Sequence, residues 1–121
     1  MIRDVVLAFD AWVGAGEYQR SSDKVALRLG RYEMLAGQAT FDTFGGAGDA
    51  VVGIALFHSA NGHDWIDAAM GTSGVISTDG STPNTLYFYS ASPILPFVQV
   101  RVTSSIAAHA RIYAVLRDPS D

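Results

Sequence analysis

The sequence predicts an all-β protein: an antiparallel β-sandwich with little helix, in which residues 1–121 form a single domain. Turn-forming clusters rich in glycine, serine and asparagine recur at intervals typical of a sandwich or barrel. Between them, apolar and polar residues alternate with a period of two, as in strands with one buried face. Hydrophobic residues form 49% of the chain and charged residues 17%, a composition that can fill a core of this size. We expect about seven or more strands, and less than about a fifth of the residues in helix.

The first half of the chain holds two clear strands and, between them, a segment that fits two structures. Residues 5–13 and 40–44 alternate as strands do. Residues 24–36 alternate in part, but they also carry an apolar face at helical spacing behind a serine–aspartate cap. Gly30 lies in the middle of this segment, and glycine costs a helix about 1 kcal/mol relative to alanine. We therefore favour two short strands bent at Gly30.

The second half of the chain supplies the remaining strands. The apolar run over residues 51–57 is nearly continuous, which favours a central strand covered on both faces. Residues 86–89 are aromatic-rich and strand-like. The runs over 98–103 and 110–117 alternate, and the short connection after 103 predicts that they pair as an antiparallel hairpin. The side chains expected to point inward from these two runs are Val98, Val100, Val102, Ile112, Ala114 and Leu116, with Gln99, Arg101 and Thr103 facing outward.

Charge and cysteine content argue against several classes of function. The net charge is −4 and no cluster of Lys or Arg occurs, so the concentrated positive charge of a nucleic-acid surface is missing. The absence of cysteine excludes disulfides, thiolate catalysis and Cys-type zinc sites. No apolar stretch approaches the roughly 20 residues of a membrane span, and the N-terminus lacks the pattern of a signal peptide. We expect a protein that is made in a cytoplasm and binds neither nucleic acid nor membrane.

No catalytic motif stands out. The chain contains no Gly-x-Ser-x-Gly nucleophile elbow, and its scattered serines, histidines and aspartates suggest no catalytic triad. The glycine-rich loop over residues 45–48 lacks the Lys-Ser/Thr of a phosphate-binding loop and does not precede a helix. We expect the protein not to be an enzyme and to carry no cofactor.

Two groups of polar residues have the residue types, but not the spacing, of a metal site. Two histidines and two aspartates flank the turn at residues 60–62, namely His58, His63, Asp64 and Asp67. The loop over residues 78–84 offers oxygen ligands for calcium at Asp79, Ser81 and Asn84. Turn chemistry accounts for both groups, so we predict no metal ion at either.

Three aromatic residues are candidates for surface binding: Trp12, Tyr18 and Trp65. Tryptophan commonly packs in a core, but it also stacks on sugars and anchors interfaces. For Trp65 we favour packing in the core or against its own loop. Trp12 lies beside the glycine-rich turn at residues 14–16, and its position fits either core packing or surface binding.

Two segments together resemble a known family. Residues 55–65 contain Ser59-Ala60-Asn61-Gly62-His63-Asp64-Trp65, which is similar to the strand–turn–strand pattern S-x-D/N-G-x-x-W of discoidin-like, galactose-binding-like β-sandwiches. Residues 96–102 are similar to the strand of those domains that starts at a proline. Asn61-Gly62 fits a tight hairpin with positive φ.

The resemblance covers about half the chain and implies a jelly-roll sandwich, also found in small structural proteins of bacteriophage particles. Ala60 stands where the family has a polar turn residue, the paired cysteines of the secreted members are missing, and no sugar-binding triad can be mapped.

Two functions fit these observations. The first is a structural interaction protein of a bacteriophage virion, a capsid decoration (cement) or tail-associated protein that docks on capsid or tail proteins, itself monomeric or a homo-oligomer. The apolar-rich composition and the lack of catalytic groups favour it, and we expect the chain termini and the loops over 17–24 and 45–49 to make contacts. The alternative is a carbohydrate-binding module that uses Trp12, Tyr18 and Trp65.

Overall fold

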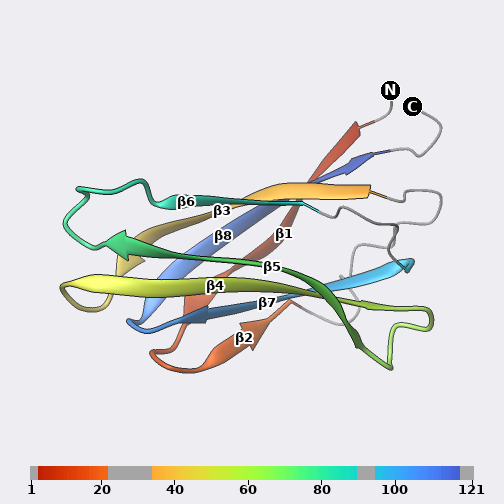
Figure 1. Ribbon diagram of the computed structural model, residues 1–121, viewed down its shortest axis with the longest axis horizontal. Helices are drawn as coiled ribbons and strands as arrows, with labels where there is room; N and C mark the ends of the chain where they lie inside the picture. The colour runs from red at the N-terminus through yellow and green to blue at the C-terminus, as the bar shows by residue number, and fades with distance from the viewer. Residues whose placement is uncertain (1–2, 22–33, 90–94, 118–121) are drawn as a thin grey trace.

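The computed structural model describes residues 3–21, 34–89 and 95–117, and these residues form an all-β sandwich (Figure 1). Eight strands are described, which confirms the predicted fold class: β1 (Arg3–Val13), β2 (Tyr18–Arg20), β3 (Met34–Phe44), β4 (Asp49–Ser59), β5 (Ile66–Ser77), β6 (Thr85–Tyr89), β7 (Phe97–Ser104) and β8 (Ala108–Arg117). Residues 24–33 of the segment with two predicted structures lie outside the described residues, and its last three residues, 34–36, begin β3. Within the described ranges, no helix has the length and apolar character needed to cross a membrane.

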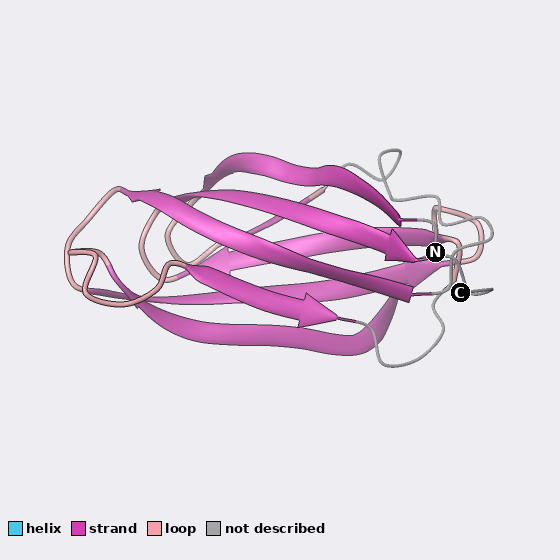
Figure 2. Ribbon diagram, turned by 90° about the horizontal axis from the view of Figure 1, so that it is seen from above, coloured by secondary structure: helices cyan, strands magenta, loops and turns pink. Residues whose placement is uncertain are grey.

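The strands form two four-stranded antiparallel sheets that pack face to face (Figure 2). One sheet has the order β1-β8-β3-β6 and the other β2-β7-β4-β5. Among the described strands, each one therefore lies in the other sheet from the strand before it, except that β5 follows β4 in the same sheet and pairs with it. This is the strand order of a jelly roll, in agreement with the architecture implied by the resemblance.

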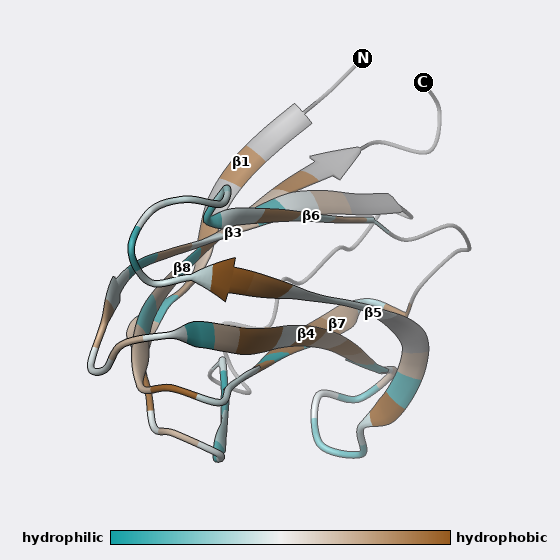
Figure 3. Cartoon of the chain, turned by 60° about the vertical axis from the view of Figure 1, so that its left-hand side comes forward, coloured by the Kyte–Doolittle hydropathy of each residue, from teal (hydrophilic) through white to brown (hydrophobic). Residues whose placement is uncertain are grey.

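The core lies between the two sheets and is built from the inward half of each alternating strand. Val98, Val100 and Val102 of β7 are buried, as are Ile112 and Ala114 of β8, which confirms these five inward predictions. The side chain of Leu116 lies outside the described residues. Figure 3 shows hydrophobic residues mostly along the strands and hydrophilic residues mostly in the loops.

The predicted hairpin of residues 98–103 with 110–117 is wrong. β7 and β8 lie in different sheets: β7 pairs with β2 and β4, and β8 pairs with β1 and β3. The connection between them crosses from one sheet to the other, held by the bonds from Ser105 N to Val51 O (2.9 Å) and from Gly45 N to Ala107 O (2.7 Å). Alternation shows which side chains of a strand point toward the core. Two strands that face each other from different sheets show the same alternation as two strands paired in one sheet, so the pattern does not identify the partner.

Two further expectations about facing are wrong. β4 is central in its sheet but is covered on one face only, because Val52, Ile54 and Leu56 are buried while Val51 is 56% exposed. Gln99 alternates with the buried valines of β7 and yet is fully buried. Its side-chain oxygen accepts a hydrogen bond from Arg101 Nε at 2.9 Å, which supplies a polar partner for a buried amide.

The turn at Asn61–Gly62 has the predicted positive φ, with Gly62 at +78°. The connection is longer than a tight hairpin, because it spans residues 60–65 between β4 and β5. Asn61 Oδ1 closes it by accepting hydrogen bonds from the backbone N–H groups of His63 (2.8 Å) and Asp64 (2.9 Å). Ser59 Oγ accepts from Gly62 N at 3.0 Å. This loop lies at one end of the sandwich, and the other four described connections lie at the opposite end (Figure 1).

Candidate functional site

The outer face of the β1-β8-β3-β6 sheet holds the largest ordered arrangement of exposed functional side chains. Directly paired residues in neighbouring strands lie side by side, so the outward residues form rows across the sheet. From β1 to β6 the first row is Val5, Val115, Ala36 and Tyr89, the second is Leu7, Tyr113, Gln38 and Tyr87, and the third is Asp10, Arg111, Thr40 and Thr85. Trp12 and His109 begin the fourth row. The face therefore changes along the strands from apolar, through aromatic, to charged.

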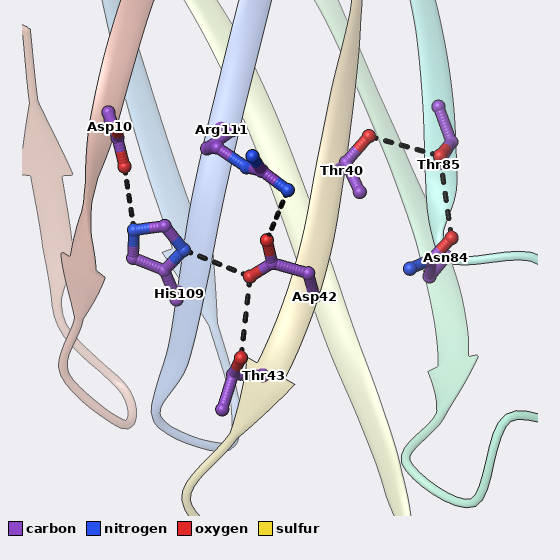
Figure 4. A network of polar contacts seen from close by, with 8 residues as sticks. All are labelled: Asp10, Thr40, Asp42, Thr43, Asn84, Thr85, His109 and Arg111. Atoms are coloured by element: carbon purple, nitrogen blue, oxygen red, sulfur yellow. Dashed lines mark hydrogen bonds and ion pairs between the residues drawn. The ribbon is translucent and has the colours of Figure 1, made fainter.

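The charged end of this face is a cluster of Asp10, Asp42, His109 and Arg111, seen in Figure 4. His109 Nε2 lies 2.6 Å from Asp10 Oδ1, and His109 Nδ1 lies 2.9 Å from Asp42 Oδ1. The other oxygen of Asp42 accepts a hydrogen bond from Arg111 Nη2 at 2.6 Å. Asp42 falls where the register of β3 with β8 shifts, between Phe41 and Thr43, and this bulge sets its carboxylate between the two basic side chains.

This geometry favours the doubly protonated histidine. Each ring nitrogen of His109 faces a carboxylate oxygen, so both nitrogens must carry a proton to donate both bonds. The hydrogen bond to Asp42, with a further contribution from Asp10, raises the pKa of His109 above its ordinary value of 6.5, against the effect of desolvation. The hydrogen bond from His109, with the charge of Arg111, lowers the pKa of Asp42, again against desolvation. The hydrogen bonds and ion pairs of the cluster link three neighbouring strands, β1, β8 and β3.

An apolar groove of about 390 Å³ crosses the other end of the same face. It is lined by Val5, Ala36, Gly37, Gln38, Tyr87, Tyr113 and Val115. The rings of Tyr87 and Tyr89 stack at its side, with centroids 5.6 Å apart and planes inclined by 26°. Ala36, Gly37 and Gln38 of β3 line it between Tyr113 of β8 and Tyr87 of β6.

The three aromatic residues predicted for surface binding do not form one site. Trp12 is 51% exposed on the outer face of the β1 sheet, where its ring lies 6.0 Å from that of His109. Tyr18 is 59% exposed on the opposite sheet, with the Arg101 guanidinium 5.7 Å from its ring centre. Trp65 lies half-buried in the β4–β5 loop, at the end of the sandwich away from Trp12.

The structure brings together three tyrosines that the sequence prediction did not select: Tyr87, Tyr89 and Tyr113. Alternation already placed Tyr113 opposite the inward residues of its strand, and Tyr87 and Tyr89 are two residues apart in a strand-like run. The missing information was the pairing of both strands with β3, since it places Tyr113 and Tyr87 on either side of Gln38.

The two groups considered as metal sites have other partners. His58 Nδ1 accepts a hydrogen bond from Leu95 N at 3.2 Å, and Asp64 accepts one from Asn61 Nδ2 at 2.8 Å. Asp79 Oδ1 accepts from Ser81 N at 2.9 Å, and the hydrogen bonds from Ser81 lower the pKa of Asp79. Among the residues that the structure describes, no three His, Asp or Glu side chains gather as metal ligands.

Comparison with known proteins finds similar folds among solved structures. No protein-family model matches the sequence, and no curated protein is similar to it. Among solved structures, the PBSX exported protein XepA is similar with a TM-score of 0.60 and 12% identity, over 95% of this chain and 37% of XepA. The SPBc2 prophage-derived protein YomS is similar with a TM-score of 0.50 and 12% identity, over 96% of this chain and 95% of YomS.

A structure of infectious bursal disease virus, Gx strain, is similar with a TM-score of 0.53 and 12% identity, over 99% of this chain and 34% of the viral chain. This chain thus spans little more than a third of XepA and about a third of the viral protein. At these identities the likeness is one of fold: the chain shares a β-sandwich architecture with these proteins.

Proposed function

We propose that this protein is a structural component of a bacteriophage particle, a capsid decoration or tail-associated protein that docks on a larger assembly without a chemical step. The observation that carries the proposal is that two exposed apolar side chains, Val51 and Val75, lie side by side on the outer face of one sheet. The large apolar side chains left exposed on the two outer faces are Val5, Leu7, Trp12, Tyr18, Val51, Ile66, Val75, Tyr87, Tyr89 and Tyr113. Scattered apolar residues are ordinary on a surface, but adjacent ones indicate contact with a partner.

The docking face that we propose is the Val51–Val75 surface, the outward part of β4 and β5 formed by Val51, Gly53, Ser73 and Val75. Val51 lies directly opposite Val75, and Gly53 lies opposite Ser73. The two valines are 56% and 57% exposed, with the uncharged Gly53 and Ser73 in the next outward row on one side and Asp49 and Ser77 on the other. The four residues of the surface carry no charge, as is typical of the centre of a protein–protein interface, and Asp49 lies at its edge. The partner is accordingly a capsid or tail protein with a complementary apolar patch.

The similar structures support the same proposal. YomS is prophage-derived by name, and the viral chain comes from a virus particle, so the architecture occurs in proteins of this class. In this proposal the protein is found in the virion, and its own oligomeric state is set by the assembly.

The test uses purified heads and tails of a phage that encodes this protein. We expect saturable, stoichiometric binding to one of them in co-sedimentation. Val75→Asp should weaken this binding about tenfold or more, because a carboxylate would be buried without a partner. Val5→Asp places the same charge at a valine of the opposite sheet that is 67% exposed, and it should leave particle binding unchanged. Failure of the unmodified protein to bind heads and tails alike would overturn the proposal.

A further inference from the structure

We infer that the groove on the outer face of the β1-β8-β3-β6 sheet binds a neutral glycan. This groove, lined by Val5, Ala36, Gly37, Gln38, Tyr87, Tyr113 and Val115, is named the tyrosine groove below. The inference goes beyond the proposed function, since it concerns the face of the sandwich opposite the Val51–Val75 surface. A protein held to a particle by one sheet would present the other sheet, and its glycan site, to the outside.

The first argument is the aromatic surface of the groove. Tyr87 is 66% exposed, Tyr89 57% and Tyr113 38%, so all three side chains are accessible to a ligand. Tyr87 and Tyr89 stack with centroids 5.6 Å apart, and this mutual contact orders the two rings on β6. The apolar C–H face of a sugar ring packs against an accessible aromatic ring, while the phenol hydroxyls stay available to its hydroxyl groups.

The second argument is the position of Gln38. In register it is the direct neighbour of Tyr113 on one side and of Tyr87 on the other, so its amide lies between two aromatic side chains. An amide offers both donors and an acceptor, which matches the mixed donor and acceptor character of sugar hydroxyls. The next row adds the hydroxyls of Thr40 and Thr85, which are hydrogen-bonded to each other at 3.1 Å. The lining of the groove thus combines apolar side chains with the amide of Gln38 and the hydroxyls of Tyr87 and Tyr113, and its volume lies in the range of ligand sites.

The third argument is charge, which selects a neutral glycan over an anionic one. None of the seven residues that line the groove carries a charge at neutral pH. On the side of Tyr113, the next positive side chain of β8, Arg111, is already bonded to Asp42, and Asp10 and Asp42 add negative charge to that end of the face. At the opposite end, Arg3 and Arg117 pair one row beyond Val5 and Val115 and are not among the lining residues. A sulfated or sialylated sugar would meet repulsion from the two aspartates and find no cation among the seven lining residues.

The test measures binding of neutral oligosaccharides, namely cellohexaose, maltohexaose, mannohexaose and chitohexaose, to the purified protein by isothermal titration calorimetry. We expect at least one of them to bind. Tyr87→Ala and Tyr113→Ala should each weaken that binding about tenfold, the scale of one lost aromatic contact. Gln38→Leu keeps the size of the side chain but removes the amide, and should also weaken binding.

Tyr18→Ala is the matched control, because Tyr18 is a similarly exposed tyrosine of the opposite sheet and should leave sugar binding unchanged. Equal melting temperatures of the variants would show that the fold is retained. The inference is overturned if no oligosaccharide binds at about 10 mM, or if binding is indifferent to Tyr87→Ala and Tyr113→Ala. It is also overturned if these variants abolish particle binding, since the groove would then be a protein interface. Val75→Asp tests the docking face separately, because it should reduce particle binding and spare sugar binding.

Discussion

Replacement of Gly37 by alanine should destabilise the protein strongly. Gly37 lies in β3 between β8 and β6, and a Cβ atom there would collide with the backbone oxygen of Tyr113 and lie 2.6 Å from Cζ of Phe88. The carbonyl belongs to a paired strand and Phe88 is buried, so neither neighbour can yield without loss of packing. Overpacking costs about 1–3 kcal/mol, whereas alanine in a strand gains roughly 0.5–1 kcal/mol over glycine. Because the clash is partly with backbone, we expect a net loss of about 2 kcal/mol, or roughly 8 °C in melting temperature.

Gly53→Ala is the matched control for this prediction. Gly53 is also a strand glycine, but its Cβ would meet chiefly the hydroxyl oxygen of Thr103 at 2.9 Å, which can rotate away. This variant should be neutral or slightly more stable. Urea unfolding of both variants measures the free energies, and thermal unfolding measures the shift. A Gly37→Ala protein as stable as the unmodified one would refute the packing argument, and equal losses in both variants would assign the effect to strand glycines in general.

Three further predictions follow from the turn, the charged cluster and the core. Gly62→Val should cost about 1 kcal/mol or more in urea unfolding, because φ is +78° and the new side chain would press on Phe97; an unchanged midpoint would contradict the turn geometry. The pKa of His109 is raised in the folded protein, so the stabilisation that protonated His109 contributes is fully present below the unfolded pKa near 6.5 and is lost as pH rises through the folded pKa. The pKa of Asp42 is lowered, so the stabilisation that its carboxylate contributes is lost as pH falls through a folded pKa below 3.8. The gap in unfolding free energy between the unmodified protein and His109→Gln should therefore narrow from pH 6 toward pH 9, and a gap that widens would show the opposite sign. Ile112→Ala should cost about 2–5 kcal/mol, as expected for a fully buried side chain of the core, and a loss below about 1 kcal/mol would count against its burial.

The alternation of residues predicted which side chains are buried better than it predicted which strands pair. Val98 and Ile112 both point inward as expected, but their strands belong to opposite sheets. A period of two shows which face of a single strand is buried. It does not show which strand pairs with it or in which sheet it lies. The same limit affected β4, where a run of apolar residues is buried on one side and leaves Val51 exposed on the other.

The candidate site depends on pairings that are remote in sequence. Asp10, Asp42 and His109 meet because β8 lies between β1 and β3 and because the β3 bulge turns Asp42 toward its neighbours. The strand character of the segments that carry Tyr87 and Tyr113 was predicted from their residues, but their meeting across Gln38 required the order β8-β3-β6. Local sequence propensity contains no information about contacts between distant strands. The aromatic residues selected from the local sequence were therefore Trp12, Tyr18 and Trp65, and not the three tyrosines.

The position of β8 has a consequence for biosynthesis. This strand is the last of the chain to leave the ribosome among those described, and it fills the place between β1 and β3, the first long strands to be made. Until it arrives, both of these strands lack a partner on the side that it will occupy, and their unpaired edges are open to association with other chains. Among the eight described strands, β4 and β5 alone pair as sequence neighbours, so most of the pairing requires long-range closure and folding should be slow for a domain of this size. A chain cut short before residue 108 would lose the strand that joins its two earliest strands, and we expect such a chain to aggregate rather than form a smaller sandwich.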